Sequence, residues 1–382
     1  MVNRSKGYAK NHQQKSMNKT IRLAQFALLI TFVALFVGFF AQSGITQSIN
    51  ITPPPGDKEI GGGVPIEEGD VLEAIPMTTR ITWKDTDIYM RDLSMDREIQ
   101  ITKDFSLNDQ DMPDIWGNKI VWMDDRNGNY DVYMYDLYLN KETQITTDPN
   151  DQGYPKIWNN RIVWWDWRND NGDVYMYNLL TGQETRITYD GWQAFPDIAG
   201  NRIVWENDED SSTDQNWDIY MLDLSTEQKI QITDHEGNQT APVVYGDRIA
   251  WTDYRNDIYG DIYMFNLLTG RETAIAAIPG TTQAGPSIWG NKIVWMDGRN
   301  DNYRYDIYLY NIATATEFQI TANEKMQYGP DIYGHKVVWI DWRNASNHVY
   351  MYDLSKGQET QINNHGPSES ASIFAPLLFP IF

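Results

Sequence analysis

Short runs of β-branched and aromatic residues alternate with polar turns along most of this chain. Two of these runs recur together. The first ends in Val-Trp or a close variant and leads into an acidic stretch, and the second resembles Asp-Ile-Tyr-Met-Tyr-Asp-Leu. Val, Ile, Tyr and Trp favour the pleated backbone, and the Gly, Asn and Asp between the runs favour tight turns. No apolar spacing of helical period persists through a repeat, so the pattern predicts an all-β fold.

Seven copies of this pair lie between Ile81 and Leu354. The tryptophans of the first run are Trp83, Trp122, Trp164, Trp205, Trp251, Trp295 and Trp339, and successive ones are 39 to 46 residues apart. This spacing is the length of one four-stranded propeller blade. The sequence therefore predicts a seven-bladed β-propeller of four-stranded antiparallel blades over residues 76–376.

The repeat at Pro155 predicts strands over 155–157, 161–166, 173–179 and 184–188. Because the strands run up and down, the Asp-x-Arg-Asn loops between strands two and three share a face with the connections between blades. In propellers the first strand of each blade lies innermost.

Blade one has no first strand before Arg80, whereas residues 369–375 continue the repeat beyond blade seven. We expect this C-terminal segment to be the missing innermost strand of blade one. It would close the ring by pairing an otherwise open strand edge.

Composition limits the chemistry of the 382-residue chain. Because there is no cysteine, disulfides, thiolate metal sites and cysteine nucleophiles are excluded. The net charge of -22 predicts no nucleic-acid partner and favours cations or basic partners. Excess carboxylate also keeps an exported domain soluble.

The N-terminal segments indicate export. Residues 1–22 form a basic leader, residues 23–43 an apolar signal peptide or membrane anchor, and residues 44–75 a Pro/Gly-rich linker. Residues 377–382 are an apolar tail. We expect an extracellular, cell-surface protein, either anchored or secreted, that meets the membrane through its N-terminal segment only.

The repeated Asp-x-Arg-Asn motif supplies the first candidate ligand-binding residues. Five blades carry it, and its arginines are Arg126, Arg168, Arg255, Arg299 and Arg343. A ring of arginines suits carboxylated or sulfated glycans, which accept paired hydrogen bonds. Alternatively, each arginine pairs with its own aspartate and builds the blade, and the repetition favours this structural interpretation.

A glutamine three residues before the proline of each repeat gives a second ring of candidates. These are Gln110, Gln152, Gln193, Gln239, Gln283 and Gln327. Their amides, near the mouth of the ring, suit hydrogen bonding to sugar hydroxyls. The alternative is that each amide satisfies the backbone of its own interblade connection.

Blade four departs from the motif. Its loop lacks the arginine and carries Asp208, Glu209, Asp210 and Asp214. Oxygen ligands of this kind suit Ca²⁺, although acidic surface loops are also common and the spacing is not that of an EF-hand.

The repeated phrases Pro-x-Ile-x-Gly-Asn-x-Ile-Val-Trp-x-Asp-x-Arg-Asn, Asp-Ile-Tyr-Met-Tyr-Asp-Leu and Thr-Gly-x-Glu-Thr-Gln-Ile-Thr resemble the TolB-type β-propeller repeat of archaeal cell-surface proteins. The resemblance covers about residues 80–374 and implies a surface-displayed propeller without an assigned reaction.

Binding is the function that the sequence favours, with envelope polysaccharide or another surface protein as the partner. Trp167, Trp192, Tyr254 and Trp342 near the loops suit stacking on sugar rings or packing between loops. No nucleophile elbow, zinc motif or phosphate loop is present, so an enzyme is the less favoured class. The alternatives are a lyase or hydrolase of acidic glycans and an architectural spacer of a surface layer.

Overall fold

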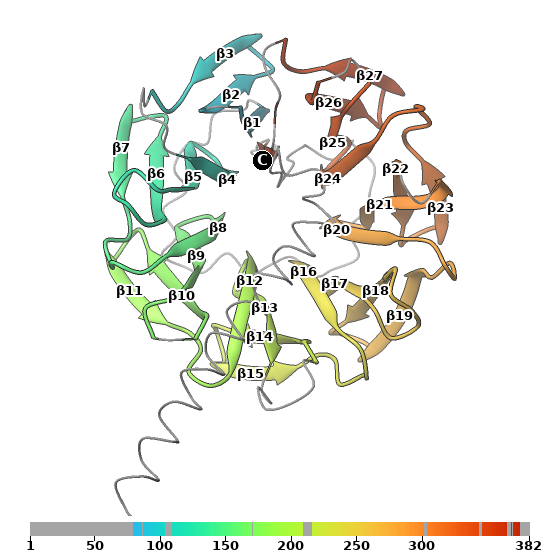
Figure 1. Cartoon of the computed structure of the whole chain (residues 1–382), viewed down its shortest axis with the longest axis horizontal. Helices are drawn as coiled ribbons and strands as arrows, with labels where there is room; N and C mark the ends of the chain where they lie inside the picture. Colours follow the sequence, from blue (N-terminus) through green and yellow to red (C-terminus); the bar gives the residue numbers. More distant parts are fainter. Residues whose placement is uncertain are drawn as a thin grey trace, which may run out of the picture. The chain divides into compact units, whose positions relative to one another are not determined.

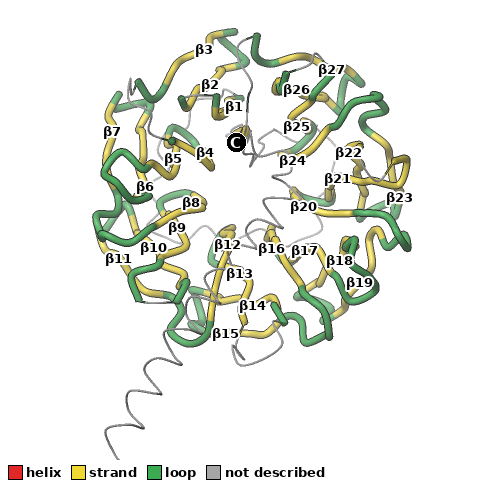
Figure 2. Tube along the Cα trace, viewed as in Figure 1, coloured by secondary structure: helices red, strands yellow, loops and turns green. Residues whose placement is uncertain are grey.

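The computed structural model describes residues 79–374 except 86, 104–108, 170, 209–215, 302–303, 344–345, 365–367 and 369, and of 372–374 only the backbone. The expectations for residues 1–75 and 377–382 lie outside the described residues. The described part contains strands and loops, as Figure 2 shows, and none of it is a helix that could span a membrane.

The strands form seven four-stranded antiparallel sheets, one per blade, and confirm the predicted propeller. Figure 1 shows the first strand of each blade innermost and the fourth at the rim. In chain order the strands of blades one to three are β1 (Arg80–Lys84), β2 (Ile88–Asp92), β3 (Arg97–Gln100), β4 (Gln110–Trp116), β5 (Lys119–Asp124), β6 (Asp131–Asp136), β7 (Lys141–Gln144), β8 (Gln152–Trp158), β9 (Arg161–Asp166), β10 (Asp173–Asn178) and β11 (Gln183–Arg186).

The remaining blades follow the same order. Their strands are β12 (Trp192–Ala199), β13 (Arg202–Asp208), β14 (Asp218–Asp223), β15 (Gln228–Gln231), β16 (Gln239–Tyr245), β17 (Arg248–Asp253), β18 (Asp261–Asn266), β19 (Arg271–Ala276), β20 (Gln283–Trp289), β21 (Lys292–Asp301), β22 (Arg304–Asn311), β23 (Thr316–Gln319), β24 (Gln327–Tyr333), β25 (Lys336–Asp341), β26 (His348–Asp353), β27 (Gln358–Gln361) and β28 (Ser370–Phe374).

The ring closes as predicted. β28 pairs with β1 along its whole length, from Arg80 opposite Phe374 to Lys84 opposite Ser370. The four strands of blade one therefore come from both ends of the propeller, in the order β28-β1-β2-β3. We call the face with the interblade connections the loop face, and the opposite face, with the turns after strands one and three, the turn face.

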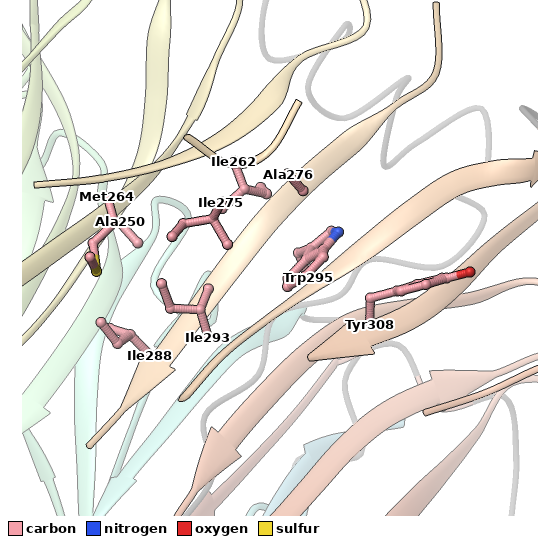
Figure 3. Packing of buried hydrophobic residues seen from close by; sticks show 9 residues of the cluster. All are labelled: Ala250, Ile262, Met264, Ile275, Ala276, Ile288, Ile293, Trp295 and Tyr308. Carbon is pink, nitrogen blue, oxygen red and sulfur yellow. The ribbon is translucent and has the colours of Figure 1, made fainter. Parts of the chain in front are cut away.

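Apolar residues on both faces of each blade are buried against the neighbouring blades. Figure 3 shows one such interface, in which Ile288, Ile293 and Trp295 of blade six pack against Ile262 and other residues of blade five. The repeated tryptophan is among the largest buried side chains and is at most 2% exposed in all seven blades. Two-sided burial explains why the strands have apolar residues on both faces.

The inner strands begin earlier than the sequence predicts. The expected strand at Pro155 starts instead at Gln152, and its pairing with β9 shifts between Gly153 and Lys156. The other five proline-containing inner strands have the same bulge, and the residue before each proline has a positive φ of 47° to 61°. Proline has no N–H to donate, so it fits at a bulge where the ladder is interrupted.

Candidate functional site

The arginines of the Asp-x-Arg-Asn motif lie in clamps within their own blades. In blade three, the Asp166 carboxylate is fully buried and accepts hydrogen bonds from Trp164 Nε1 at 2.9 Å, Arg168 Nε at 2.9 Å and Arg168 Nη2 at 2.6 Å. Arg168 Nη1 donates to Glu184 of the outer strand at 2.6 Å, and its guanidinium lies 4.3 Å from the centre of the Tyr175 ring. The indole, the guanidinium and two carboxylates thus satisfy one another.

The same clamp holds Arg126, Arg255, Arg299 and Arg343, each between its own aspartate and a fourth-strand glutamate. Burial lowers the pKa of Arg168, but the hydrogen bonds to Asp166 and Glu184 raise it above its usual value. These arginines are therefore fixed cations of the blade, in agreement with the structural interpretation of the motif.

The six glutamines lie at the loop-face start of the inner strands, as the first residue of each except Gln193, which is the second residue of β12, and they are buried, with at most 1% exposed. Gln239 Nε2 donates to the carbonyl of Gly237 at 2.6 Å, and Gln283 Nε2 donates to the Thr281 hydroxyl at 2.7 Å. Gln152, Gln193 and Gln327 also donate to a nearby backbone carbonyl of their own interblade connection, and Gln110 contacts Thr102 at 3.4 Å. Their geometry thus favours the local, structural interpretation.

Of the proposed calcium ligands, only Asp208 lies within the described residues, where it ends β13 and is 5% exposed. Glu209, Asp210 and Asp214 lie outside them. The described residues contain no group of three or more His, Asp or Glu placed to hold a metal ion. In this blade Asn207 takes the place of the clamp aspartate, and the buried Trp205 Nε1 has no hydrogen-bond partner among the described residues.

At the bulges, near the loop-face end of the ring axis, the residue before the proline differs in size from blade to blade. The residues before the prolines are half-buried, and they are Met112, Tyr154, Phe195, Ala241, Gly285 and Gly329. The Tyr154 and Phe195 rings meet edge to face with centroids 4.7 Å apart, and Trp165 lies 5.8 Å from Tyr154. Blades three and four therefore contribute aromatic rings at this level, whereas blades five to seven contribute a methyl group or no side chain.

A buried carboxyl group lies within electrostatic range of the Tyr154 ring. Glu206, which is 4% exposed, accepts a hydrogen bond from the backbone N–H of Ala241 in the next blade. Burial raises the pKa of Glu206 to about 8, and this hydrogen bond offsets only part of the effect. Burial also raises the pKa values of Tyr154 and Tyr254, and the Glu206 charge contributes to both shifts, so the three side chains are electrostatic neighbours.

The inner-strand residues that follow the prolines, on the turn-face side of the bulges, include charged side chains. Burial lowers the pKa of Lys156, but Asp114, Asp197 and Asp331 outweigh it and raise the pKa. Two of the carboxylates also join blades: Asp114 accepts from Ile157 N and Asp197 from Val244 N, both at 2.8 Å. Lys156 thus remains a cation, which argues against a role as a nucleophile.

The loop-face aromatics singled out from the sequence fall into two groups. Trp167 packs on Trp165 and Trp192, with centroids 5.0 and 5.4 Å apart, whereas Trp342 is 43% exposed. The sequence analysis missed Tyr154 and Phe195, and Glu206 stands in the acidic stretch of blade four that was considered only for calcium. Two features of the sequence point to this region. The residue before the proline varies between blades, and a glutamate follows Trp205 where the other blades have different residues.

No family model matches the chain, and no curated protein matches it. Several solved structures match the chain. The β-propeller domain of the Trilobed protease from Pyrococcus furiosus is 14% identical, with 73% of this chain and 88% of that chain covered and a TM-score of 0.58. TolB from Acinetobacter baumannii is 15% identical, with 77% and 81% covered and a TM-score of 0.50.

The fold is TolB-like. An oligogalacturonate lyase from Vibrio parahaemolyticus is also similar, at 14% identity over 76% of this chain and 85% of that chain, with a TM-score of 0.52. At these identities the likeness concerns the fold alone, because this architecture supports binding and several kinds of catalysis.

Proposed function

We propose that this protein is an exported cell-surface binding module that recognises a glycan of the cell envelope at the loop-face end of the ring axis. The observation that carries the proposal is the half-buried ring pair of Tyr154 and Phe195, with the carboxyl of Glu206 within electrostatic range of Tyr154. Aromatic faces suit the apolar side of a sugar ring, and nearby carboxyl and hydroxyl groups suit its hydroxyls. The basic leader and the apolar segment after it support export.

The charges at this site favour a neutral glycan. The five motif arginines already bind two carboxylates each, so they offer little to an acidic ligand. The ionisable side chains near Tyr154 include Asp111 and Glu206, which repel anions when they are ionised. A neutral sugar avoids this repulsion and uses the same hydrogen-bonding groups.

Two alternative functions, a spacer and an enzyme, can be compared with specific observations. The locked arginines favour an architectural spacer, because a clamp in five blades stabilises the ring without any ligand. The enzyme alternative expected a histidine beside arginines at the mouth of the ring. His235 Nε2 lies 3.7 Å from Glu272, which also binds Arg255, but Glu272 belongs to the outermost strand of blade five. His365 lies outside the described residues.

The test is retention of full-length protein on a panel of neutral envelope polysaccharides, with the recovered glycans examined for cleavage. Phe195→Ala should weaken retention about tenfold, because one stacking contact contributes on the order of 1 kcal/mol. Tyr138→Ala, at a ring that is 83% exposed on the turn face, serves as the control. Absence of retention by every glycan would reject the proposal in favour of a protein partner or a spacer, and cleavage would favour the enzyme.

A further inference from the structure

At the turn-face end of the axis, aromatic rings and cations are paired in register. Of the six inner strands that contain a proline, five end in an aromatic residue that lies directly opposite the basic residue that begins the next strand, and in blade one Phe374 lies opposite Arg80 in the same way. The five pairs are Trp116 with Lys119, Trp158 with Arg161, Tyr245 with Arg248, Trp289 with Lys292 and Tyr333 with Lys336. In blade four Ala199 lies opposite Arg202. Residues paired in this way lie on the same face of their sheet.

The rings form one layer around the axis. Trp158 lies 6.3 Å from both Tyr245 and Trp289, and Tyr245 lies 4.3 Å from Trp289, measured between centroids. Blades three and six are not neighbours, so the contact between Trp158 and Trp289 spans the axis. Trp116, Trp158 and Tyr245 are only half-buried, so this layer presents aromatic surface to solvent.

The charge around this layer is uneven. In blades two, four and seven the basic residue lies opposite an aspartate that ends the third strand, with N–O distances of 3.6 to 3.7 Å. In blades three, five and six that aspartate is an asparagine: Asn178 opposite Arg161, Asn266 opposite Arg248 and Asn311 opposite Lys292. The blades without this carboxylate are the ones that supply Trp158, Tyr245 and Trp289.

Arg248 has the clearest capacity for a further partner. Its Nη1 donates to the carbonyl of Gly290 at 2.9 Å, whereas its buried Nε has no hydrogen-bond partner within the part of the chain that the structure describes. Among the described residues it forms no ion pair with a carboxylate. A guanidinium beside an exposed aromatic surface suits a carboxylate carried on a ring, because the ring stacks while the carboxylate accepts paired hydrogen bonds.

We propose that the turn-face end of the axis is a second carbohydrate site, specific for an acidic sugar such as a uronate residue. The sugar ring lies on the layer of Trp158, Tyr245 and Trp289, and its carboxylate pairs with Arg248. The aspartates that face the cations of blades two, four and seven disfavour a second carboxylate at those cations, whereas no such aspartate faces Arg248 in blade five. This site is independent of the loop-face site and binds a different class of glycan.

The experiment measures the affinity of full-length protein for a galacturonate oligomer and for the same oligomer with its carboxyl groups reduced to alcohols. Asn266→Asp restores the aspartate found in other blades and keeps the turn, because Asn266 Oδ1 accepts from Leu268 N and Thr269 N as Asp136 does from Tyr138 N and Leu139 N. It should weaken binding of the acidic oligomer about tenfold or more. Lys336→Gln, at a cation that already faces Asp353, should change it little.

Equal affinity for the acidic and the reduced oligomer would overturn the proposal, as would an affinity that Asn266→Asp leaves unchanged. Vesicles containing anionic phospholipid form a separate arm, and binding of vesicles without binding of the oligomer would also overturn it. Phe195→Ala, at the loop face, should leave the acidic oligomer bound. Failure at one site is thereby distinguished from failure at the other.

Discussion

Lys229 Nζ lies 4.5 Å from the centre of the Tyr220 ring in blade four, where five other blades place an arginine guanidinium at 4.0 to 4.3 Å from the equivalent tyrosine. In the sequence, Lys229 occupies the place of the clamp glutamate. Blade four therefore keeps a cation on the ring after losing the aspartate, the arginine and the glutamate of the clamp. Because a cation still contacts the tyrosine ring in a blade that lacks the rest of the clamp, we infer that this contact stabilises the blade.

The first prediction concerns the arginine clamp. Arg168→Ala leaves the fully buried Asp166 without its main partner, so the free energy of unfolding should fall by about 2–4 kcal/mol. Arg304→Ala is the control: its side chain is 58% exposed, and it should change stability by less than about 0.5 kcal/mol. Urea denaturation measures both. If Arg168→Ala kept wild-type stability but lost glycan binding, the result would indicate that the motif arginines bind the ligand.

Glu206 should make stability depend on pH. Its folded-state pKa of about 8 lies above its ordinary value of 4.5, so the folded state holds the proton more tightly than the unfolded state does. The free energy of unfolding should therefore decline as pH rises from about 4.5 to about 8 and then level off. Glu206→Gln keeps an acceptor for Ala241 N–H and cannot ionise.

At pH 9 the Glu206→Gln variant should be more stable than wild type by roughly 2–4 kcal/mol, and at pH 4 nearly equal to it. Denaturation curves at these two pH values measure the difference. An equal difference at both would show that Glu206 does not titrate in this range.

The ring closure can be tested at one residue of β28. Ala371 is fully buried and lies opposite Trp83 in β1. Ala371→Pro removes a backbone N–H and restricts φ, so it should destabilise the propeller by about 3 kcal/mol or more. Ala371→Ser keeps the N–H and serves as the control. Thermal unfolding followed by near-ultraviolet circular dichroism would detect the loss, and equal melting temperatures for the two variants would contradict the role of β28.

The bulges give a prediction with a matched pair of alanines. Ala241 has a φ of 51°, where the equivalent residues of blades six and seven are Gly285 and Gly329. Ala241→Gly should be neutral or stabilising by up to about 1 kcal/mol, because glycine adopts this conformation without strain. Ala194, which is buried and pairs with Glu206 just before the bulge of β12, should lose roughly 1 kcal/mol on the same change. Equal losses would mean that Ala241 is unstrained.

The repeat in the sequence was sufficient to predict the number of blades, the bounds of β9 and the return of the C-terminal strand. It was sufficient because equivalent positions in seven blades have the same environment between neighbouring blades. The start of β8 was predicted wrongly at Pro155. A proline usually ends or interrupts pairing, and the bulge that lets the strand continue on both sides of it depends on the backbone geometry around the axis.

The axis-facing residues could not be predicted in the same way. Tyr154, Phe195 and Gly285 occupy one repeat position but differ in size, because side chains at the axis meet residues from several blades. The change from aspartate to asparagine at Asn178 is visible in the sequence. Its relation to Arg161 appears only once the pairing register is known. The repeat thus predicts the strands and the blades, whereas the candidate sites lie at positions where the blades differ.

The closure of blade one also determines how the ring carries mechanical load. A force applied to the chain at Thr79 enters β1, which is paired on one side with β2 and on the other with β28. Pulling along this central strand shears two rows of backbone hydrogen bonds together, whereas an edge strand can be peeled away one bond at a time. A tether joined to the N-terminal side of the propeller would therefore pull on a strand held from both sides.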